Sequence, residues 1–193
     1  MQIVIATNNK HKIDEYRKIF PSIDFLSLED EGIKVDAKET GKTFEENSLI
    51  KALAVSMYTN KIILADDSGL IIDSLPGILG VYSHRFMSET DSYNKKATKI
   101  LEMLENKDRK AHFECVITIL NLVDKPLVFK GRVDGRINDK IEGTGGFGYD
   151  IIFVPDGYDH TFASMDEKIK NSLSHRADAT KKMVEYLKKE GLL

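Results

Sequence analysis

The sequence contains a single cysteine, no tryptophan and only four prolines among its 193 residues. Cys115 cannot form a disulfide bond within the chain, and its place in the apolar run FECVITIL predicts a buried strand residue. No apolar run approaches the roughly 18 residues that a membrane-spanning helix needs. Charged residues from Lys10 onward exclude the apolar core of a secretory signal. We therefore expect a cytoplasmic protein with no membrane partner.

A strong net charge is also lacking. Lysine and arginine total 28 against 31 aspartates and glutamates, which gives a formal net charge of -3. This balance excludes the overall basic field that attracts nucleic acid, so an anion must be bound by a local cluster of cations. With 41% hydrophobic residues, the chain is long enough to bury a core. Because it has no repeats or linkers, residues 1–193 are expected to form one domain.

Hydrophobic patterning predicts strands and helices that interleave without a strict βαβ rhythm. A capping box, with Thr43 as the N-cap and Glu46 as the N3 residue, predicts the start of one helix. This pattern indicates an α/β fold in which a mixed, twisted central sheet is flanked by helices. Strands are expected over residues 3–6, 23–28, 61–65, 70–75, 112–122, 126–133 and 149–154, and helices over 11–20, 44–58, 89–105 and a C-terminal segment containing 183–187.

Two motifs resemble nucleotide-binding signatures, but their contexts do not fit. GTGGFG, residues 143–148, satisfies G-x-G-x-x-G, yet a strand and not a helix is expected to follow it. Its glycines indicate either a tight backbone close to a flat ligand or another segment, or an ordinary hairpin loop. ETGKT ends like a P-loop, but Asp36 occupies the position of the first glycine and Glu39 adds a second negative charge.

Three acidic residues, Glu39, Asp66 and Asp67, are expected at turns between predicted elements. Carboxylate oxygens are the ligands that Mg²⁺ prefers, together with water and substrate phosphates. The alternative for the DDSG segment is a turn in which aspartate bonds to its own backbone. Since adjacent residues at a strand end point in opposite directions, we expect one aspartate to serve the site and the other to support the turn.

Cations and amides gather at expected helix starts. Lys12 follows TNN at a helix N-terminus, where free N–H groups and the helix dipole favour anions. Lys51 lies one turn after Asn47 on the capped helix, and Ser174 is a candidate N-cap of the last helix. Together with acids that can hold Mg²⁺, these groups indicate a polyphosphate site. The candidate cations are Lys12, Lys51, Lys170, His175 and Arg176.

Five segments carry a resemblance over essentially the whole chain: TNNKHK, ETGKTFEENSLIKA, ADDSGL, GGFGYD and KNSLSHR. Their order and spacing resemble the inosine triphosphate pyrophosphatase family. The resemblance implies an elongated, two-lobed α/β fold with a substrate cleft, and a homodimer. It also implies Mg²⁺-dependent hydrolysis of ITP, dITP and XTP to the monophosphate and pyrophosphate.

The resemblance further implies roles for individual residues. Glu39 and Asp67 would hold Mg²⁺, and Asp67 would also accept a proton from the attacking water. The substrate would be bound by Thr7, Asn8, Asn9, Lys12 and Lys51 at the phosphates, by Ser68, by Phe147, Gly148, Tyr149 and Asp150 as the base pocket, and by Lys170, His175 and Arg176 at base and phosphates.

The chain departs from the family pattern at Leu79, His84, Lys168 and Ile169, which affects the expected loop conformation and substrate preference. Phe147 or Tyr149 is expected either to stack on the base or to belong to the core. Three other functions are open: a Maf-like pyrophosphatase with a different base preference, a nucleotide-binding module without turnover, and a structural domain. Intact Glu39 and Asp67 favour an enzyme over the binding module, and a structural domain would require all five segments to be accidental.

Overall fold

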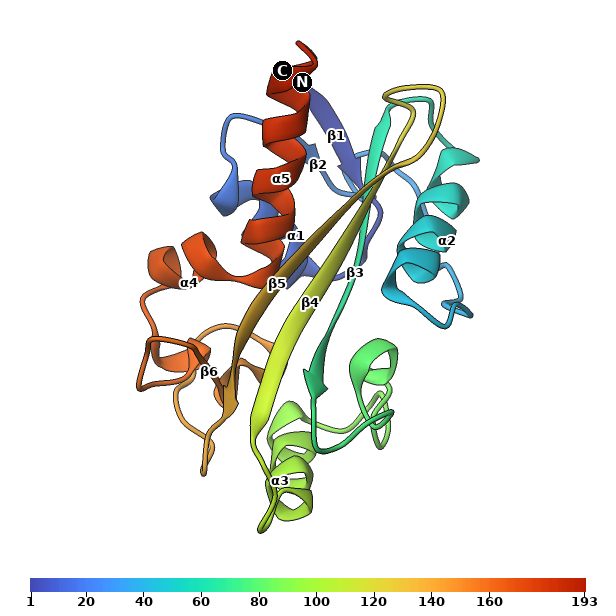
Figure 1. The fold of residues 1–193 in the computed structure, drawn as a ribbon. Coiled ribbons are helices and arrows are strands. Elements are labelled where there is room, and N and C mark those ends of the chain that lie inside the picture. Colours follow the sequence, from blue (N-terminus) through green and yellow to red (C-terminus); the bar gives the residue numbers. More distant parts are fainter. The chain divides into compact units, whose positions relative to one another are not determined.

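A computed structural model describes residues 1–193 and contains one six-stranded sheet of order β2-β1-β3-β4-β5-β6 (Figure 1). β1 pairs in parallel with β2 and β3, whereas β5 and β6 pair antiparallel. The predicted mixed sheet with flanking helices is therefore confirmed. The strands are β1 (Gln2–Ile5), β2 (Asp24–Leu26), β3 (Ile62–Ile72), β4 (Lys110–Leu120), β5 (Leu127–Ile137) and β6 (Phe153–Pro155), and the α-helices are α1 (Lys10–Ile19), α2 (Phe44–Ser56), α3 (Tyr93–Met103), α4 (Glu167–Leu173) and α5 (His175–Lys189).

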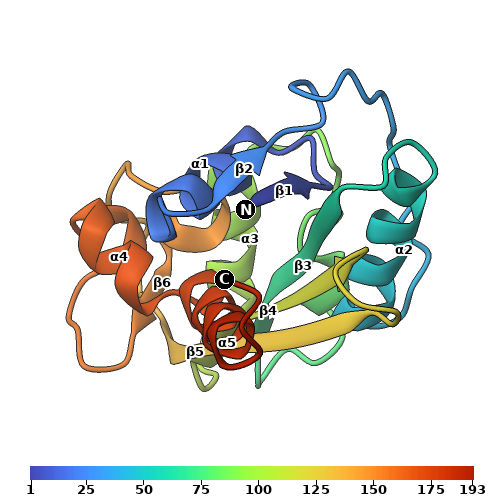
Figure 2. The ribbon, with the colours of Figure 1, turned by 90° about the horizontal axis from the view of Figure 1, so that it is seen from above.

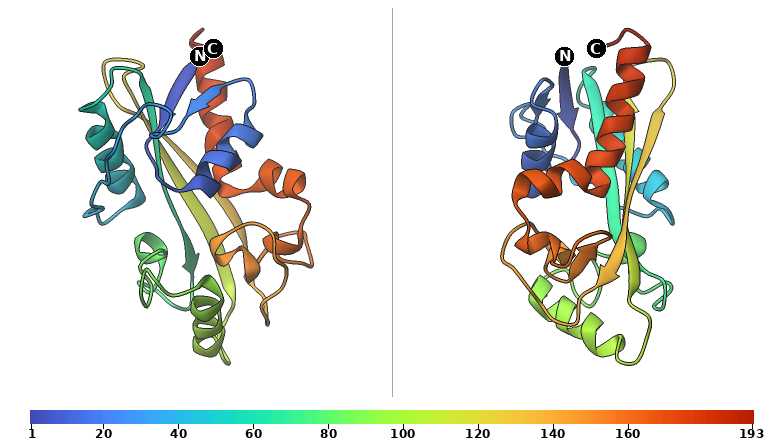
Figure 3. Two further views of the ribbon diagram at one scale, coloured as in Figure 1. Left: turned by 180° about the vertical axis from the view of Figure 1, so that it is seen from behind. Right: turned by 60° about the vertical axis from the view of Figure 1, so that its left-hand side comes forward.

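The chain divides into two compact units. The first unit comprises Met1–Ser68, Cys115–Gly131 and Arg176–Leu193, and the second unit comprises Gly69–Glu114 and Arg132–His175. The three long strands β3, β4 and β5 contribute residues to both units. Both chain termini belong to the first unit and lie close together (Figure 3). None of the helices is both long enough and apolar enough to cross a membrane.

The first unit has helices on both faces of its strands (Figure 2). Side chains alternate along β1 because successive strand residues point to opposite faces. Ile3 and Ile5 pack with α1 and α5, while Val4 and Ala6 pack with α2. The predicted cap of α2 is present, since Thr43 Oγ1 accepts from the Glu46 N–H at 3.1 Å. Buried apolar side chains therefore pack α1 and α5 against one face of these strands and α2 against the other.

An aromatic cluster forms part of the core of the second unit. Phe113 and Phe153 meet edge to face with ring centroids 4.8 Å apart, and Phe162 lies 5.2 Å from Phe153. Ile100 of α3 and Leu70 of β3 are also fully buried in this core. This core supports the Gly148–Ile151 segment, which carries part of the predicted base pocket.

The prediction of two strands separated by a DDSG turn is wrong. β3 is one continuous strand, so Asp66, Asp67 and Ser68 lie inside it. Gly69 lies inside this strand, and its lack of a side chain lets the Gly80 backbone approach, since a Cβ at Gly69 would lie 2.3 Å from the Gly80 carbonyl oxygen. A glycine in a strand often marks such a close approach of another backbone. Both aspartates are consequently held on a rigid, buried element.

Other boundaries also differ from the prediction. The helix expected from residue 89 begins at Tyr93, because the Ser92 side chain caps it by accepting from the Lys95 N–H. The strand expected over 149–154 is instead a 3₁₀ turn, Gly148–Ile151, followed by β6. The predicted hairpin is supported by the neighbouring positions of β4 and β5, since their six-residue connection is too short for a parallel crossover.

Candidate active site

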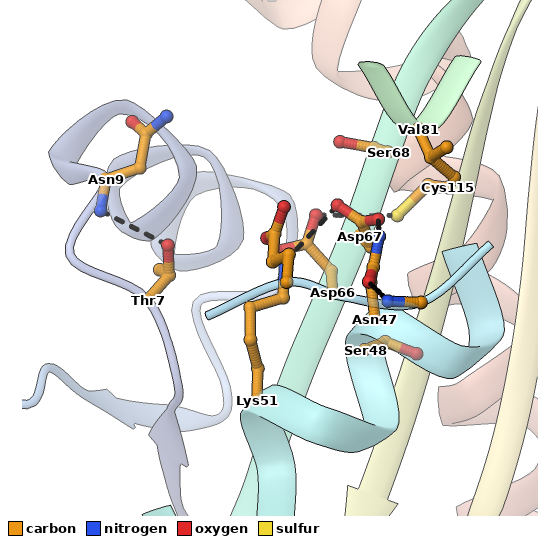
Figure 4. Close-up of polar contacts among 12 residues, drawn as sticks. Thr7, Asn9, Asn47, Ser48, Lys51, Asp66, Asp67, Ser68, Val81 and Cys115 are labelled. Atoms are coloured by element: carbon orange, nitrogen blue, oxygen red, sulfur yellow. Dashed lines mark hydrogen bonds and ion pairs between the residues drawn. The ribbon is translucent and has the colours of Figure 1, made fainter. Parts of the chain in front are cut away.

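The predicted phosphate loop connects β1 to α1. Asn9 is the N-cap of α1, and its Oδ1 accepts from the His11 N–H at 3.0 Å and the Lys12 N–H at 3.4 Å. Thr7 Oγ1 accepts from the Asn9 N–H at 3.2 Å (Figure 4). Asn8 Nδ2 donates to the Val35 carbonyl at 3.1 Å. These bonds fix the loop at the positive end of the helix dipole, where anions are favoured.

Asp66 is completely buried in β3 and binds two cations. Its Oδ2 accepts from Lys12 Nζ and from Arg176 Nη2, each at 3.0 Å, and Cys115 Sγ lies 3.7 Å away. Its Oδ1 is buried without a hydrogen-bond partner. Burial alone would raise the pKa of Asp66, but the charges of Lys12 and Arg176 outweigh burial and hold it far below its usual value. Asp66 is therefore ionised, and its carboxylate holds the Lys12 ammonium in place.

Arg176 is the largest fully buried side chain of the protein, with 1% of its surface exposed. Its Nη1 forms an ion pair with the Glu15 carboxylate, and its Nη2 also donates to Ser68 Oγ at 3.1 Å. The guanidinium lies over the Tyr16 ring, 5.7 Å from the centroid. Arg176 thus connects α5, α1 and β3 within the first unit, and its predicted contact with the substrate stays a prediction.

Sequence reasoning missed Glu15 and gave Asp66 only a supporting role in a turn. One signal for Glu15 was available, because it lies three residues after Lys12 on α1 and next to the core residue Tyr16. A charged residue on a buried helix face requires a partner. Nothing local in the sequence identified that partner, Arg176, which lies 161 residues away.

Asp67 faces the opposite side of β3 and meets residues of α2 and of the loop before it. Lys51 Nζ donates to Glu39 Oε1 at 2.7 Å and to Asp67 Oδ1 at 3.3 Å. Asn47 Nδ2 donates to Asp67 Oδ2 at 3.0 Å (Figure 4). The expectation that the two aspartates point in opposite directions is confirmed, although neither supports a turn. Asp66 holds Lys12, whereas Asp67 joins Lys51 and Glu39.

Burial controls the electrostatics of Asp67. It raises the pKa of the carboxyl, and the opposing charges of Lys51 and Lys12 do not cancel the effect. Burial lowers the pKa of Lys51, but Asp67, Asp66 and Glu39 together raise it above its usual value. Lys51 is therefore a permanent cation beside a carboxylate that is more basic than an exposed one. Such a carboxylate is suited to accept a proton.

The chemistry of this cluster fits a divalent cation. Glu39 and Asp67 present carboxylate oxygens to one point, Lys51 Nζ, and share its single positive charge. Two carboxylates with one ammonium leave a net charge of about -1, which favours a further cation. Hard oxygen ligands and a nearby phosphate site are what Mg²⁺ prefers. The role of Glu39 and Asp67 as Mg²⁺ ligands stays a prediction.

The predicted base-pocket residues lie in the second unit. Asp150 is buried, and its Oδ2 accepts from Lys170 Nζ at 2.6 Å and from the Phe147 N–H at 2.8 Å. The Lys170 ammonium lies 5.1 Å from the Phe147 ring centroid. Gly146 has a φ of +65°, and a Cβ there would lie 2.2 Å from Asp150 Oδ2. The glycine segment therefore folds tightly around the Asp150 carboxylate.

The two aromatic residues of this segment differ in burial. Tyr149 is 3% exposed and donates its hydroxyl to the Ser83 carbonyl at 2.7 Å. Its ring packs edge to face on Tyr93 with centroids 5.2 Å apart. Tyr149 is therefore a core residue, whereas Phe147 is partly exposed. His175 stacks on Phe113 with centroids 4.8 Å apart and an interplanar angle of 13°, which fixes the orientation of the imidazole.

The four residues that depart from the family pattern do not disturb the contacts of the predicted base-pocket residues. Leu79 is buried in the second core, and His84 is exposed. Lys168 and Ile169 lie on the exposed part of α4, whereas Lys170 points inward to Asp150. Patterning did not predict this helix, which begins at Glu167 and is capped by Asp166, whose side chain accepts from the Lys168 N–H at 2.9 Å.

Comparisons with known proteins test the family and the fold. A family model described as the Ham1 family matches residues 3–186. The dITP/XTP pyrophosphatases of Thermoanaerobacter pseudethanolicus and Flavobacterium johnsoniae are 41% and 42% identical to this chain; the alignments cover 98% and 97% of this chain, respectively, and 98% of each relative. The structure of the Staphylococcus aureus Ham1 protein superposes with a TM-score of 0.87 at 39% identity, covering 98% of this chain and 100% of that one. The resemblance inferred from the motifs is therefore confirmed.

Proposed function

Since the chain belongs to the Ham1 family, we propose that it is a nucleoside-triphosphate pyrophosphatase acting on deaminated purine nucleotides. Its substrates are XTP, dITP and ITP, and its products are the nucleoside monophosphate and pyrophosphate. The observation that carries this proposal is the cluster of Glu39, Lys51 and Asp67 in a chain about 40% identical, over nearly its full length, to dITP/XTP pyrophosphatases.

In the proposed reaction, water attacks the α-phosphorus and pyrophosphate leaves. Asp67 accepts the proton of that water, as a carboxylate placed beside the phosphates can do. The loop of Thr7, Asn8 and Asn9 binds phosphate oxygens at the start of α1. Lys12, anchored by Asp66, and Lys51 stabilise the negative charge that grows on the leaving group.

The proposed cofactor is Mg²⁺, held by Glu39 and Asp67. A magnesium ion held there would offset the charge of the phosphate oxygens. Lys51 Nζ, 2.7 Å from Glu39 Oε1 and 3.3 Å from Asp67 Oδ1, supplies a positive charge to both carboxylates. Further parts of the proposal, carried by the resemblance, are a homodimer, which light scattering tests, and a cytoplasmic location.

Selectivity is proposed to arise at position six of the purine. Xanthine and hypoxanthine carry a carbonyl there, and adenine carries an amino group. A hydrogen-bond donor in the site can therefore bond to xanthine or hypoxanthine but stays unpaired opposite adenine. The proposed donors are the oriented His175 and the backbone N–H groups of Gly148 and Tyr149, since the Phe147 and Asp150 N–H groups already donate within the segment. Phe147, the more exposed aromatic residue, is the proposed stacking partner of the base.

A substrate panel tests this function. Pyrophosphate release is measured with Mg²⁺ from XTP, ITP, GTP, ATP and dTTP, each with an EDTA control. We expect rapid turnover of XTP and ITP, at least about 10² times slower turnover of ATP, and no turnover with EDTA. A preference for dTTP would instead favour a Maf-like specificity. Binding of XTP without pyrophosphate release would identify a nucleotide-binding module and contradict the proposal.

A further inference from the structure

Asn47 of α2 lies between two parts of the candidate active site and is fully buried. Its Nδ2 donates to Asp67 Oδ2 at 3.0 Å. Its Oδ1 accepts from the Gly41 N–H at 2.8 Å, in the loop that carries Glu39. Figure 4 shows its side chain beside Asp67. One amide thus links the Glu39 loop to the β3 carboxylate.

The chemistry of this link suits a carboxamide. An ionised carboxylate such as Asp67 accepts hydrogen bonds and does not donate, whereas a backbone N–H donates and does not accept. A side chain that joins the two must therefore donate with one atom and accept with another, and an anionic side chain would be repelled by Asp67 and Glu39. Because the side chain is buried, each missing bond would leave a polar group unsatisfied. Asparagine meets all of these conditions at this distance.

Gly41 provides independent support for a close fit. A Cβ at Gly41 would lie 2.7 Å from Asn47 Oδ1 and 2.7 Å from Glu46 Cβ. Even the smallest side chain would therefore push the loop away from the Asn47 amide. The loop approaches α2 closely only because residue 41 has no side chain, and this approach brings Glu39 to Lys51, 2.7 Å from its Nζ.

We propose that Asn47 is a positioning residue of the pyrophosphatase reaction, which rests on the function proposed above. Its amide holds the Glu39 loop and the Asp67 carboxylate in one arrangement, and so sets the separation of the two carboxylates. Lys51, one turn later on α2, completes the same arrangement from the other side. Asn47 acts through Asp67 and Glu39 and is not assigned a contact with the substrate.

Asn47→Leu tests the proposal, because leucine has a similar volume and no hydrogen-bonding group. We expect kcat for XTP to fall at least about 10-fold and KM to change less than about 3-fold, since a small misplacement of reacting groups affects the chemical step most. Ser48→Ala is the matched control. Ser48 is equally buried on α2, and its hydroxyl bonds to Thr118 Oγ1 at 2.7 Å, away from Asp67 and Glu39. Its kcat is expected to stay within about 2-fold of the wild type.

Asn47→Gln separates positioning from simple structural support. Glutamine keeps both amide functions on a longer side chain, so it is expected to recover a substantial part of the kcat lost in Asn47→Leu. An Asn47→Leu variant as active as Ser48→Ala would overturn the proposal, and so would an Asn47→Gln variant no better than Asn47→Leu.

The failure of the proposed function is distinguishable, because the wild type would then release no pyrophosphate from any nucleotide. The link itself is still measured in that case by hydrogen exchange at the Gly41 N–H. We expect slow exchange in the wild type and in Ser48→Ala, and fast exchange in Asn47→Leu. Equal exchange in all three proteins would contradict the link.

Discussion

Replacing Asp67 by asparagine is expected to lower kcat for XTP at least about 100-fold, the usual contribution of a positioned general base. The substitution preserves the shape of the side chain and the ability to accept from Asn47 Nδ2, which lies 3.0 Å from Oδ2. It removes the charge that Lys51 faces and the basic oxygen that accepts a proton. Steady-state pyrophosphate release under saturating Mg²⁺ measures the effect.

The same variant should not lose stability. Because burial raises the pKa of Asp67, the fold disfavours its ionised form, and a neutral amide removes that cost. We expect its free energy of unfolding in urea to lie within about 1 kcal/mol of the wild type. A stable Asp67→Asn protein that retains full activity would exclude Asp67 as the base. An unfolded one would contradict the electrostatic account.

Asp66→Asn, unlike Asp67→Asn, is expected to destabilise the fold. The expected loss in free energy of unfolding is about 3 kcal/mol, the order found when one partner of a buried ion pair is removed. Lys12 and Arg176 share the Asp66 Oδ2 atom, each at 3.0 Å. Without the carboxylate, the Arg176 guanidinium, 1% exposed, keeps its ion pair with Glu15 but loses the one with Asp66. Equilibrium urea unfolding at pH 7 measures the loss.

The pH dependence of stability provides a second measurement on Asp66. Its folded-state pKa lies well below its unfolded value of about 3.9. Its contribution is therefore fully present above that unfolded pKa and is lost as the pH falls through about 4 toward the folded pKa. The wild type should lose stability between about pH 5 and pH 2, and Asp66→Asn should lose less over the same range.

Asp30→Asn is the matched control for an exposed ion pair. Asp30 pairs with Arg17 at 2.8 Å, but both side chains are almost half exposed. Exposed pairs contribute little because water screens them, so a much smaller change is expected. If Asp66→Asn and Asp30→Asn were equally stable, the buried network would not support the fold.

Features encoded by local chemistry could be predicted from the sequence. The TNN segment follows a short apolar strand and begins a helix, and the structure places Asn9 as its cap. The Thr43 cap likewise fixed the start of α2, and with it the shared face of Asn47 and Lys51. These predictions depend only on neighbours within a few residues, which is why they hold.

Features determined by distant contacts could not be predicted in the same way. DDSG has the composition of a turn, but it lies inside β3, where the distant Gly80 backbone packs closely against Gly69. The roles of Asp66 and Glu15 depend on Arg176, more than 100 residues away. Tyr149 belongs to the core because Tyr93 and Ser83 surround it, although its motif suggested a ligand contact equally well.

The most direct test of the pyrophosphatase assignment is hydrolysis of XTP in water enriched in ¹⁸O, with the products separated and their masses determined by mass spectrometry. Attack at the α-phosphorus predicts one ¹⁸O atom in the nucleoside monophosphate and unlabelled pyrophosphate, in the wild type and in the residual activity of Asp67→Asn. Label in the pyrophosphate, or release of single phosphates, would contradict the assignment.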